Sequence, residues 1–319
     1  MNKKGWKQFF IFALAAMMLC ACQPKSENTD GDVDKAQEAE IKEKTGDDKE
    51  KLAQKYDFTK ASTLKMKNFF AYMPKTTIIG VKNGTFMEVP AKDGFVVMQG
   101  SCSDGTYIYT ILEKQRAIIN GESTNIHKIF KIDMNGWEIV AESEQLLLGH
   151  GNSMTYNSKT NQLIVSNYSP NPKEITFIDP DSLTITGSRI LNQDITGIAY
   201  NEVHDQYVLA NGSAQFSIVD ADFNEIIYVE GHYIGLGTQD IDCDDNYIYV
   251  GNSGVVSNPG VEVVKVYDWD GEYRGIYRVD SVNEQEAIFN ANGKYYITFY
   301  TGSGGRIFEI QYDFALLEG

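Results

Sequence analysis

The chain has 319 residues, which is enough for one large domain or two ordinary ones. Apolar residues make up 42% and aromatic residues 12%, chiefly 19 Tyr and 16 Phe, and this globular composition favours β-strands. The formal net charge of -16 argues against nucleic acid as a partner, because an acidic surface repels phosphate polymers.

The N-terminus has the pattern of a secretion signal. Residues 1–8 are basic, and the apolar run 9–19 is shorter than the roughly 20 residues that a membrane span needs. The run ends in Leu19-Cys20-Ala21-Cys22, which resembles the bacterial lipobox. The resemblance implies that residues 1–21 are removed and that Cys22 is lipidated, which would give a stable membrane anchor. A plain secretion signal is the alternative.

Residues 22–60 are predicted to form a disordered, charged tether. From residue 23 onward they hold eight basic and eleven acidic residues and almost no large apolar ones. Such a segment cannot bury enough apolar surface to offset its ordering entropy. We therefore expect it to act as a stalk between the membrane and a folded domain over residues 61–319.

A strand–hairpin–strand pattern recurs five times in the rest of the chain. Each copy alternates apolar and polar residues around a hairpin of Asn, Asp, Gly, Lys or Ser, and it continues into a third strand and a fourth. The aligned first-strand residues are Cys102, Tyr156, Tyr200, Cys243 and Phe289. The third strand ends in Asp at Asp133, Asp179, Asp220 and Asp268, where the carboxylate is expected to accept turn N–H groups.

Four strands in each repeat of 41–54 residues match the blade of a β-propeller. Residues 95–319 resemble the quinoprotein- and YVTN-like propeller superfamily in this repeat pattern. The predicted fold is therefore an all-β β-propeller with five blades of four antiparallel strands. Residues 76–89 are expected to complete the last blade. Six blades, with a degenerate one over 61–95, is the alternative.

Two cysteines lie in the predicted propeller. Cys102 and Cys243 fall in blades that are not neighbours, and both are expected to be buried and unbridged. A disulfide between them is the alternative.

A ring of polar residues at one end of the central channel is the candidate binding site. The links between blades lie at this end, and two contain Gly-His, at Gly149-His150-Gly151 and Gly231-His232. Glycine lets the backbone pass close to the channel there. Polar loops on a rigid ring commonly bind ligands, and a long loop between the second and third strands is predicted over residues 113–127. The candidate binding residues are Gln99, His150, Asn152, Tyr168, His232, Gln239, Asp240, Asn252, Gln285 and Glu286. The alternative is that the ring only satisfies channel waters and strand ends.

The motifs for catalysis and cofactors are weak. The sequence has no nucleophile elbow, phosphate loop or zinc spacing, so no cofactor and no metal are expected. The segment 240–246 contains four Asp residues, which could indicate a calcium site. Their place in a strand and a hairpin turn is the alternative explanation. Some five-bladed propellers are glycoside hydrolases with paired carboxylates near the axis. Asp240 and Glu286 are the alternative catalytic pair, because they enter adjacent inner strands.

These observations predict a lipid-anchored, extracytoplasmic propeller that acts as a binding or scaffolding module. The expected ligand is a glycan or a protein of the cell envelope, and the anchor is the contact with the membrane. Gln23 permits sorting to an outer membrane where the cell has one. The alternatives are a glycosidase-like enzyme and an assembly factor for an envelope complex.

Overall fold

The computed structural model divides the chain into two compact units, Met1–Lys75 and Thr76–Gly319. The described residues all belong to the second unit and are 78–79, 86–119, 122–212, 214–231, 236–254, 262–279, 281 and 283–312. The predicted signal segment, Cys22 and the charged tether lie outside them. The described part is all-β, so it offers no long apolar helix that could cross a membrane.

Two antiparallel sheets each consist of four consecutive strands. The first contains β7 (Ser153–Asn157), β8 (Gln162–Ser166), β9 (Glu174–Ile178) and β10 (Ile185–Ile190). The second contains β11 (Gly197–Asn201), β12 (Gln206–Ala210), β13 (Phe216–Asp220) and β14 (Glu225–Val229).

A third sheet has the same antiparallel build and one added strand. It contains β15 (Gly237–Cys243), β16 (Tyr247–Ser253), β17 (Glu262–Asp268) and β18 (Tyr273–Val279). The short β1 (Ile78–Ile79) pairs in parallel with the outer edge of β18.

The remaining strands form two antiparallel sets that share a single parallel bridge between Gly304 and Val97. One set contains β3 (Val97–Ser103), β4 (Tyr107–Ile119), β5 (Glu122–Asp133) and β6 (Glu138–Glu142). The other contains β19 (Glu284–Ala291), β20 (Lys294–Tyr300), β21 (Gly304–Ile310) and β2 (Phe86–Pro90).

The predicted closing segment 76–89 divides between two sheets. Its second half, β2, pairs antiparallel with β21 and completes the C-terminal set, as expected. Its first half, β1, lies on β18 instead, which corrects the prediction that the whole segment joins the last sheet. The outer edge of β18 offers unpaired backbone groups that β1 can bond.

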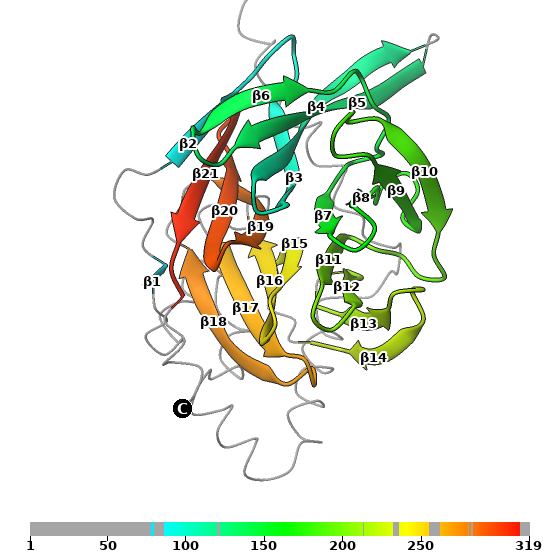
Figure 1. The fold of residues 1–319 in the computed structure, drawn as a ribbon, viewed down its shortest axis with the longest axis vertical. Coiled ribbons are helices and arrows are strands. Elements are labelled where there is room, and N and C mark those ends of the chain that lie inside the picture. The colour runs from blue at the N-terminus through cyan, green and yellow to red at the C-terminus, as the bar shows by residue number, and fades with distance from the viewer. Residues whose placement is uncertain are drawn as a thin grey trace, which may run out of the picture. The chain divides into compact units, whose positions relative to one another are not determined.

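The sheets are arranged as in a propeller (Figure 1). Each inner strand contacts the next one in the order β3, β7, β11, β15 and β19, and β19 contacts β3 again. Burial follows this order, because every residue of the inner strand β11 is buried while the outer strand β10 is mostly exposed. An inner strand is covered on both faces, so its polar residues are buried as well, as Gln99 and Ser101 of β3 are.

The hydrophobic core lies between neighbouring sheets rather than within any one of them. Tyr109 and Ile129 of the β3–β6 set pack with Leu163 and Ile178 of the next sheet. A corresponding cluster packs the β3–β6 set against β19–β21 and β2, and so closes the ring of contacts. Each such buried side chain contributes about 1.5–3 kcal/mol by removal from water, so packing between neighbouring sheets is a main source of stability.

The register corrects the predicted alignment of one repeat. Cys102 lies opposite Tyr109, and the matching residue opposite Tyr249 is Asp242 rather than Cys243. The sequence alignment is therefore off by one in this repeat, because the two hairpins have the same length: Ser103 lies opposite Ile108, and Cys243 lies opposite Ile248. Both cysteines are buried and unbridged, as expected.

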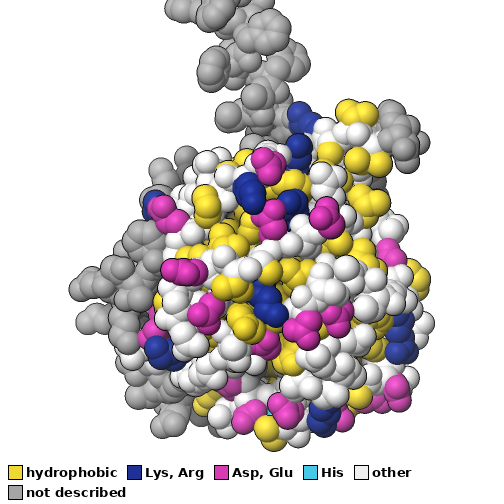
Figure 2. Space-filling model, turned by 45° about the horizontal axis from the view of Figure 1, so that its top comes forward, with side chains coloured by type: hydrophobic (Ala, Val, Ile, Leu, Met, Phe, Trp, Pro, Cys, Tyr) yellow, Lys and Arg dark blue, Asp and Glu magenta, His cyan; other side chains and the backbone are white. Residues whose placement is uncertain are grey.

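A predicted loop over residues 113–127 is a long hairpin instead. Strands β4 and β5 stay paired out to Ile119 and Glu122, with one register shift between Lys114 and Ala117. Isoleucines in both arms favour extended strands, which explains the difference. Figure 2 shows apolar side chains at the projecting end of this hairpin, where Ile118 is 67% exposed.

The aspartates that end the third strands have the predicted structural role. The Asp179 carboxylate accepts the Ser182 N–H at 2.7 Å, and the Asp220 carboxylate accepts the Asn224 N–H at 2.8 Å. Asp133 and Asp268 make equivalent turn contacts. These residues hold the turn before the fourth strand.

Candidate functional site

The channel between the inner strands has two ends. We call the end where the inner strands begin the link end, because links from the preceding sheets enter there. The opposite end, where hairpins join the first and second strands, is the hairpin end.

At the link end, the Gly-His segments cross other backbone closely. Gly149 has φ +63°, and a Cβ there would lie 2.5 Å from the Asn167 carbonyl oxygen. Gly231 has φ +66°, and a Cβ there would collide with the Ala214 carbonyl. Glycine is required at both positions, since it tolerates the left-handed region and has no side chain to clash. His232 lies outside the described residues.

His150 is held against a buried carboxylate. Its Nδ1 lies 3.3 Å from Glu113 Oε2, and Nε2 of the fully buried His127 lies 3.5 Å from the same oxygen. Burial by itself would raise the pKa of Glu113, but the two adjacent histidines outweigh it and lower the pKa to about 2. Asn125 donates a hydrogen bond to Oε2 at 3.0 Å.

Glu113 and His127 are site residues that no sequence motif indicated. Both fall in the segment predicted as a loop, and they become partners only because β4 and β5 pair there. Of the predicted site residues, His150 remains partly exposed, and the ring of Tyr168 lies 6.2 Å from its imidazole. Tyr168 has a left-handed backbone with φ 54°, a conformation that non-glycine residues rarely adopt.

Most of the predicted polar ring is buried and bonded within the protein. Asn152 donates its amide to the carbonyls of Thr196 and Gln239. Gln285 donates to the carbonyls of Asn252 and Val263, at 2.8 and 2.9 Å. The buried members of the predicted ring are Gln99, Asn152, Asp240, Asn252, Gln285 and Glu286. The Asn152 contacts tie inner strands together across the channel, and the Gln285 contacts tie β19 to β16 and β17 of the neighbouring sheet.

Beta-bulges turn two further residues of this end toward their neighbours. The register of the β15–β16 pair shifts at Gln239, and that of the β19–β20 pair shifts at Glu286. A bulge changes the direction of the side chain at the extra residue. Gln239 Nε2 donates to Glu284 Oε1 at 2.6 Å, which links β15 to β19.

The carboxyl groups beside these bulges favour their neutral forms. Burial raises the pKa of Glu262 to about 8 and the pKa of Asp240 well above its usual range. Burial and the nearby carboxylates, Glu284 foremost, raise the pKa of Glu286 in the same way. The link end is therefore a buried network whose carboxyl groups favour their protonated forms, with the Glu113–His150 pair at its partly exposed margin.

The alternative catalytic pair lies inside this network. Asp240 is 1% exposed and Glu286 is 5% exposed. Asp240 Oδ2 accepts the Ile288 N–H at 3.0 Å, so it is engaged by the neighbouring inner strand. Neither carboxyl group presents an open surface to a sugar ring.

The aspartate-rich segment 240–246 is used for pairing and turns. Asp242 accepts the Asn290 side chain at 3.0 Å, and Asp244 accepts the Asn246 and Tyr247 N–H groups of its own hairpin. In the described part of the chain, no three His, Cys, Asp or Glu side chains are grouped to hold a metal ion.

The hairpin end holds a cavity of about 480 Å³, which the sequence analysis did not predict. Its walls come from the ends of all the inner strands, β3, β7, β11, β15 and β19, and from the hairpins that follow them. Its volume is in the range of known ligand sites. Burial raises the pKa of Asp242, which lines this cavity, to about 7.

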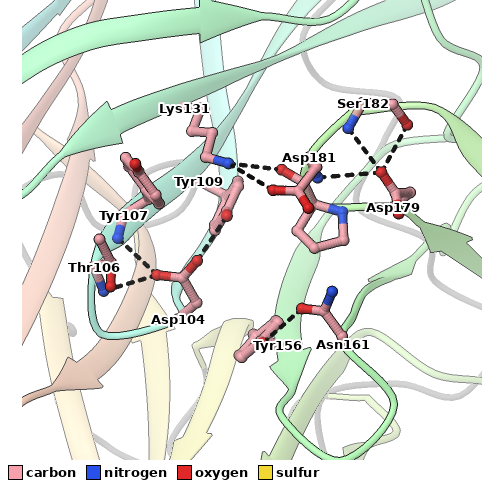
Figure 3. Close-up of polar contacts among 11 residues, drawn as sticks. Asp104, Thr106, Tyr107, Tyr109, Lys131, Tyr156, Asn161, Asp179, Asp181 and Ser182 are labelled. Atoms are coloured by element: carbon pink, nitrogen blue, oxygen red, sulfur yellow. Dashed lines mark hydrogen bonds and ion pairs between the residues drawn. The ribbon is translucent and has the colours of Figure 1, made fainter.

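Hydrogen bonds fix the hairpins around the cavity (Figure 3). Asp104 accepts the Thr106 and Tyr107 N–H groups and the Tyr109 hydroxyl. The Lys131 ammonium lies 4.3 Å from the centre of the Tyr107 ring and 3.4 Å from Asp181 Oδ1, so it joins two sheets outside the cavity wall. The walls are therefore preformed.

Comparisons with known proteins do not assign a family. No family model matches the chain, and no curated protein matches it. Among solved structures, a glutaminyl cyclase from Myxococcus xanthus has 13% identity and a TM-score of 0.49, over 71% of this chain and 95% of that one. A member of the DUF4221 family from Bacteroides vulgatus has 10% identity and a TM-score of 0.45, over 74% and 99%. At such values these likenesses support no argument about function.

Proposed function

We propose that this chain is an extracytoplasmic lipoprotein whose propeller domain binds a ligand of the cell envelope. In this proposal Cys22 carries the lipid, residues 22–60 form the stalk, and the domain over 61–319 has five blades. The lipobox-like sequence before Cys22 supports the anchor.

Two observations support five blades. The inner strands β3, β7, β11, β15 and β19 contact one another in sequence order, and the last contacts the first. In addition, β2 pairs with β21 and supplies the fourth strand of the C-terminal set. A sixth blade over 61–95 would need β2 in a sheet of its own.

The main observation in support of the binding function is the hairpin-end cavity. The ends of all the inner strands line this cavity, and its volume is in the range of small-ligand sites. The residues of the link end, in contrast, are mostly buried and bonded to one another. A preformed cavity with converging polar groups is the usual form of a small-ligand site.

Blocking the cavity tests this function. Glu202 is exposed and lines the cavity, so Glu202→Trp should fill part of it, while Glu202→Gln keeps the size of the side chain. Binding of envelope oligosaccharides, peptides and amines to the full chain would be measured by titration calorimetry. We expect Glu202→Trp to weaken binding at least tenfold and Glu202→Gln to weaken it less. Equal binding by both variants would place the ligand elsewhere.

The anchor has a separate test. Cys22→Ser should abolish incorporation of a labelled fatty acid and release the protein from the membrane fraction, and Cys20→Ser should leave both unchanged. Incorporation that survives Cys22→Ser would reject the anchor.

A further inference from the structure

The hairpin-end cavity is lined by carboxylates without opposite charges. Five of its lining residues are acidic, namely Asp104, Glu202, Asp242, Asp244 and Asp245. No Lys or Arg occurs among the described residues that line it. A cavity of this composition has a negative potential, which its partly enclosed shape strengthens by excluding water.

Hydrogen bonds already use two of these carboxylates. Asp104 and Asp244 accept the N–H groups of their own hairpins and tyrosine hydroxyls, at 2.6–2.8 Å. Their role is structural.

The other three carboxylates are available for a ligand. Asp242 and Asp245 each accept one asparagine side chain, from Asn290 and Asn201, and these donors are neutral. None of the five acidic residues is within ion-pair distance of a Lys, Arg or His side chain in the described part of the chain. The negative charge of Asp245 and Glu202, and that of Asp242 when it is ionised, is thus not balanced by the protein.

The remaining walls suit an organic cation better than a metal ion. The rings of Tyr156, Tyr200 and Tyr295 line the same cavity, and aromatic faces attract ammonium and guanidinium groups. The acidic side chains are spread over the cavity, since no three of them are grouped closely enough for a metal ion among the described residues. A volume of about 480 Å³ holds an extended alkylamine or a basic side chain.

We propose that the hairpin-end cavity binds a ligand through an ammonium or guanidinium group, with Asp242, Asp245 and Glu202 as its counter-charges. This rests on the proposed binding function and adds the chemical class of the ligand. The cation comes either from a free amine or from a Lys or Arg side chain of a protein partner.

Calorimetric titration of the full chain tests the proposal. The probes are 1,5-diaminopentane, Nα-acetyl-lysine amide, Nα-acetyl-arginine amide, the neutral Nα-acetyl-norleucine amide and calcium chloride. We expect at least one cationic organic probe to bind, and Asp242→Asn to weaken that binding at least tenfold. Asp270→Asn, which changes an exposed turn residue outside the cavity, should bind as the wild type does. Unchanged melting temperatures would show that the variants are folded.

The outcomes distinguish a free amine from a basic side chain of a partner. They also distinguish failure of the cation proposal from failure of the proposed binding function. Binding of the diamine alone supports a free amine, and binding of the amino-acid amides supports a basic side chain of a partner. Norleucine amide bound as tightly as lysine amide, or calcium bound alone, would overturn the cation proposal. An oligosaccharide that binds and is blocked by Glu202→Trp, while no cationic probe binds, would overturn it but preserve the proposed binding function. If no probe and no oligosaccharide binds, both proposals fail.

Discussion

The side-chain amide of Asn152 donates a hydrogen bond of 2.8 Å to the main-chain carbonyl of Gln239, 87 residues further along the chain. The same amide donates to the Thr196 carbonyl, so one side chain connects the beginnings of β7, β11 and β15. A buried amide that is bonded to two carbonyls stabilises a specific arrangement, because each lost bond would remove the donor from one of those carbonyls. This relationship shows how the polar ring of the link end holds the inner strands in place.

Removing that amide should destabilise the domain. We expect Asn152→Ala to lower the free energy of unfolding by about 2–4 kcal/mol, since the carbonyls of Thr196 and Gln239 lose a donor and a cavity is left in the ring. Denaturant unfolding would measure the change. Asn192→Ala is the matched control at an exposed position and should change stability by less than about 0.5 kcal/mol. Similar values for the two variants would show that the tie across the channel is unimportant.

The Gly-His-Gly crossing should not accept a side chain. Gly149→Ala places a Cβ 2.5 Å from the Asn167 carbonyl oxygen at φ +63°, so we expect a loss of about 2–4 kcal/mol in unfolding free energy. Gly187→Ala is the control, because nothing lies within 4 Å of its Cβ position. Thermal unfolding would compare the two. A fully stable Gly149→Ala would mean that the crossing is wider than the structure shows.

Stability should decrease between about pH 4.5 and pH 8. The pKa of buried Glu262 is raised to about 8, so the folded state binds its proton more tightly than the unfolded state does. This contribution is fully present below the unfolded pKa and is lost as the pH rises through the folded one. Glu262→Gln cannot titrate, and we expect it to remove about 2–4 kcal/mol of the decrease. Parallel stability profiles for the wild type and the variant would contradict this.

Glu113 should give the opposite dependence. Its pKa is lowered to about 2 by the two histidines, so its contribution is present above its unfolded pKa and is lost as the pH falls toward 2. We expect Glu113→Gln to cost about 2–3 kcal/mol at pH 7 and very little near pH 2. Urea unfolding at both pH values would measure the difference. A cost that is the same at both would exclude an ionised Glu113 as its origin.

Two truncations should separate the closing strand from the N-terminal region. Removal of residues 1–80 deletes β1 but leaves β2, and we expect the remaining chain to fold. Removal of residues 1–90 deletes β2 and exposes the edge of β21, so we expect a lower melting temperature and aggregation. Light scattering during a thermal scan would detect both effects. Equal behaviour of the two truncations would show that β2 does not close the domain.

Some of the structure was predictable because its signals are local. Alternating residues around Asn-, Asp- and Gly-rich hairpins predicted the strands, and the aspartates before the fourth strands bind their turns as expected. The glycines beside His150 predicted a close crossing, since a glycine requirement is visible in the sequence. That Asp242 rather than Cys243 is the counterpart of Cys102 was not predictable, because it depends on the register between strands.

The sequence by itself determined an all-β chain of repeated four-strand units and the polar residues that begin its inner strands. Only the tertiary structure decided that those residues bond one another, that Glu113 meets His127 and His150, and that the cavity opens at the hairpin end. Strand pattern depends on neighbours along the chain, whereas a buried charge pair or a cavity depends on segments from several sheets that meet around one axis. No single repeat contains all the residues of these contacts or of the cavity, so the candidate site forms only when the sheets pack together.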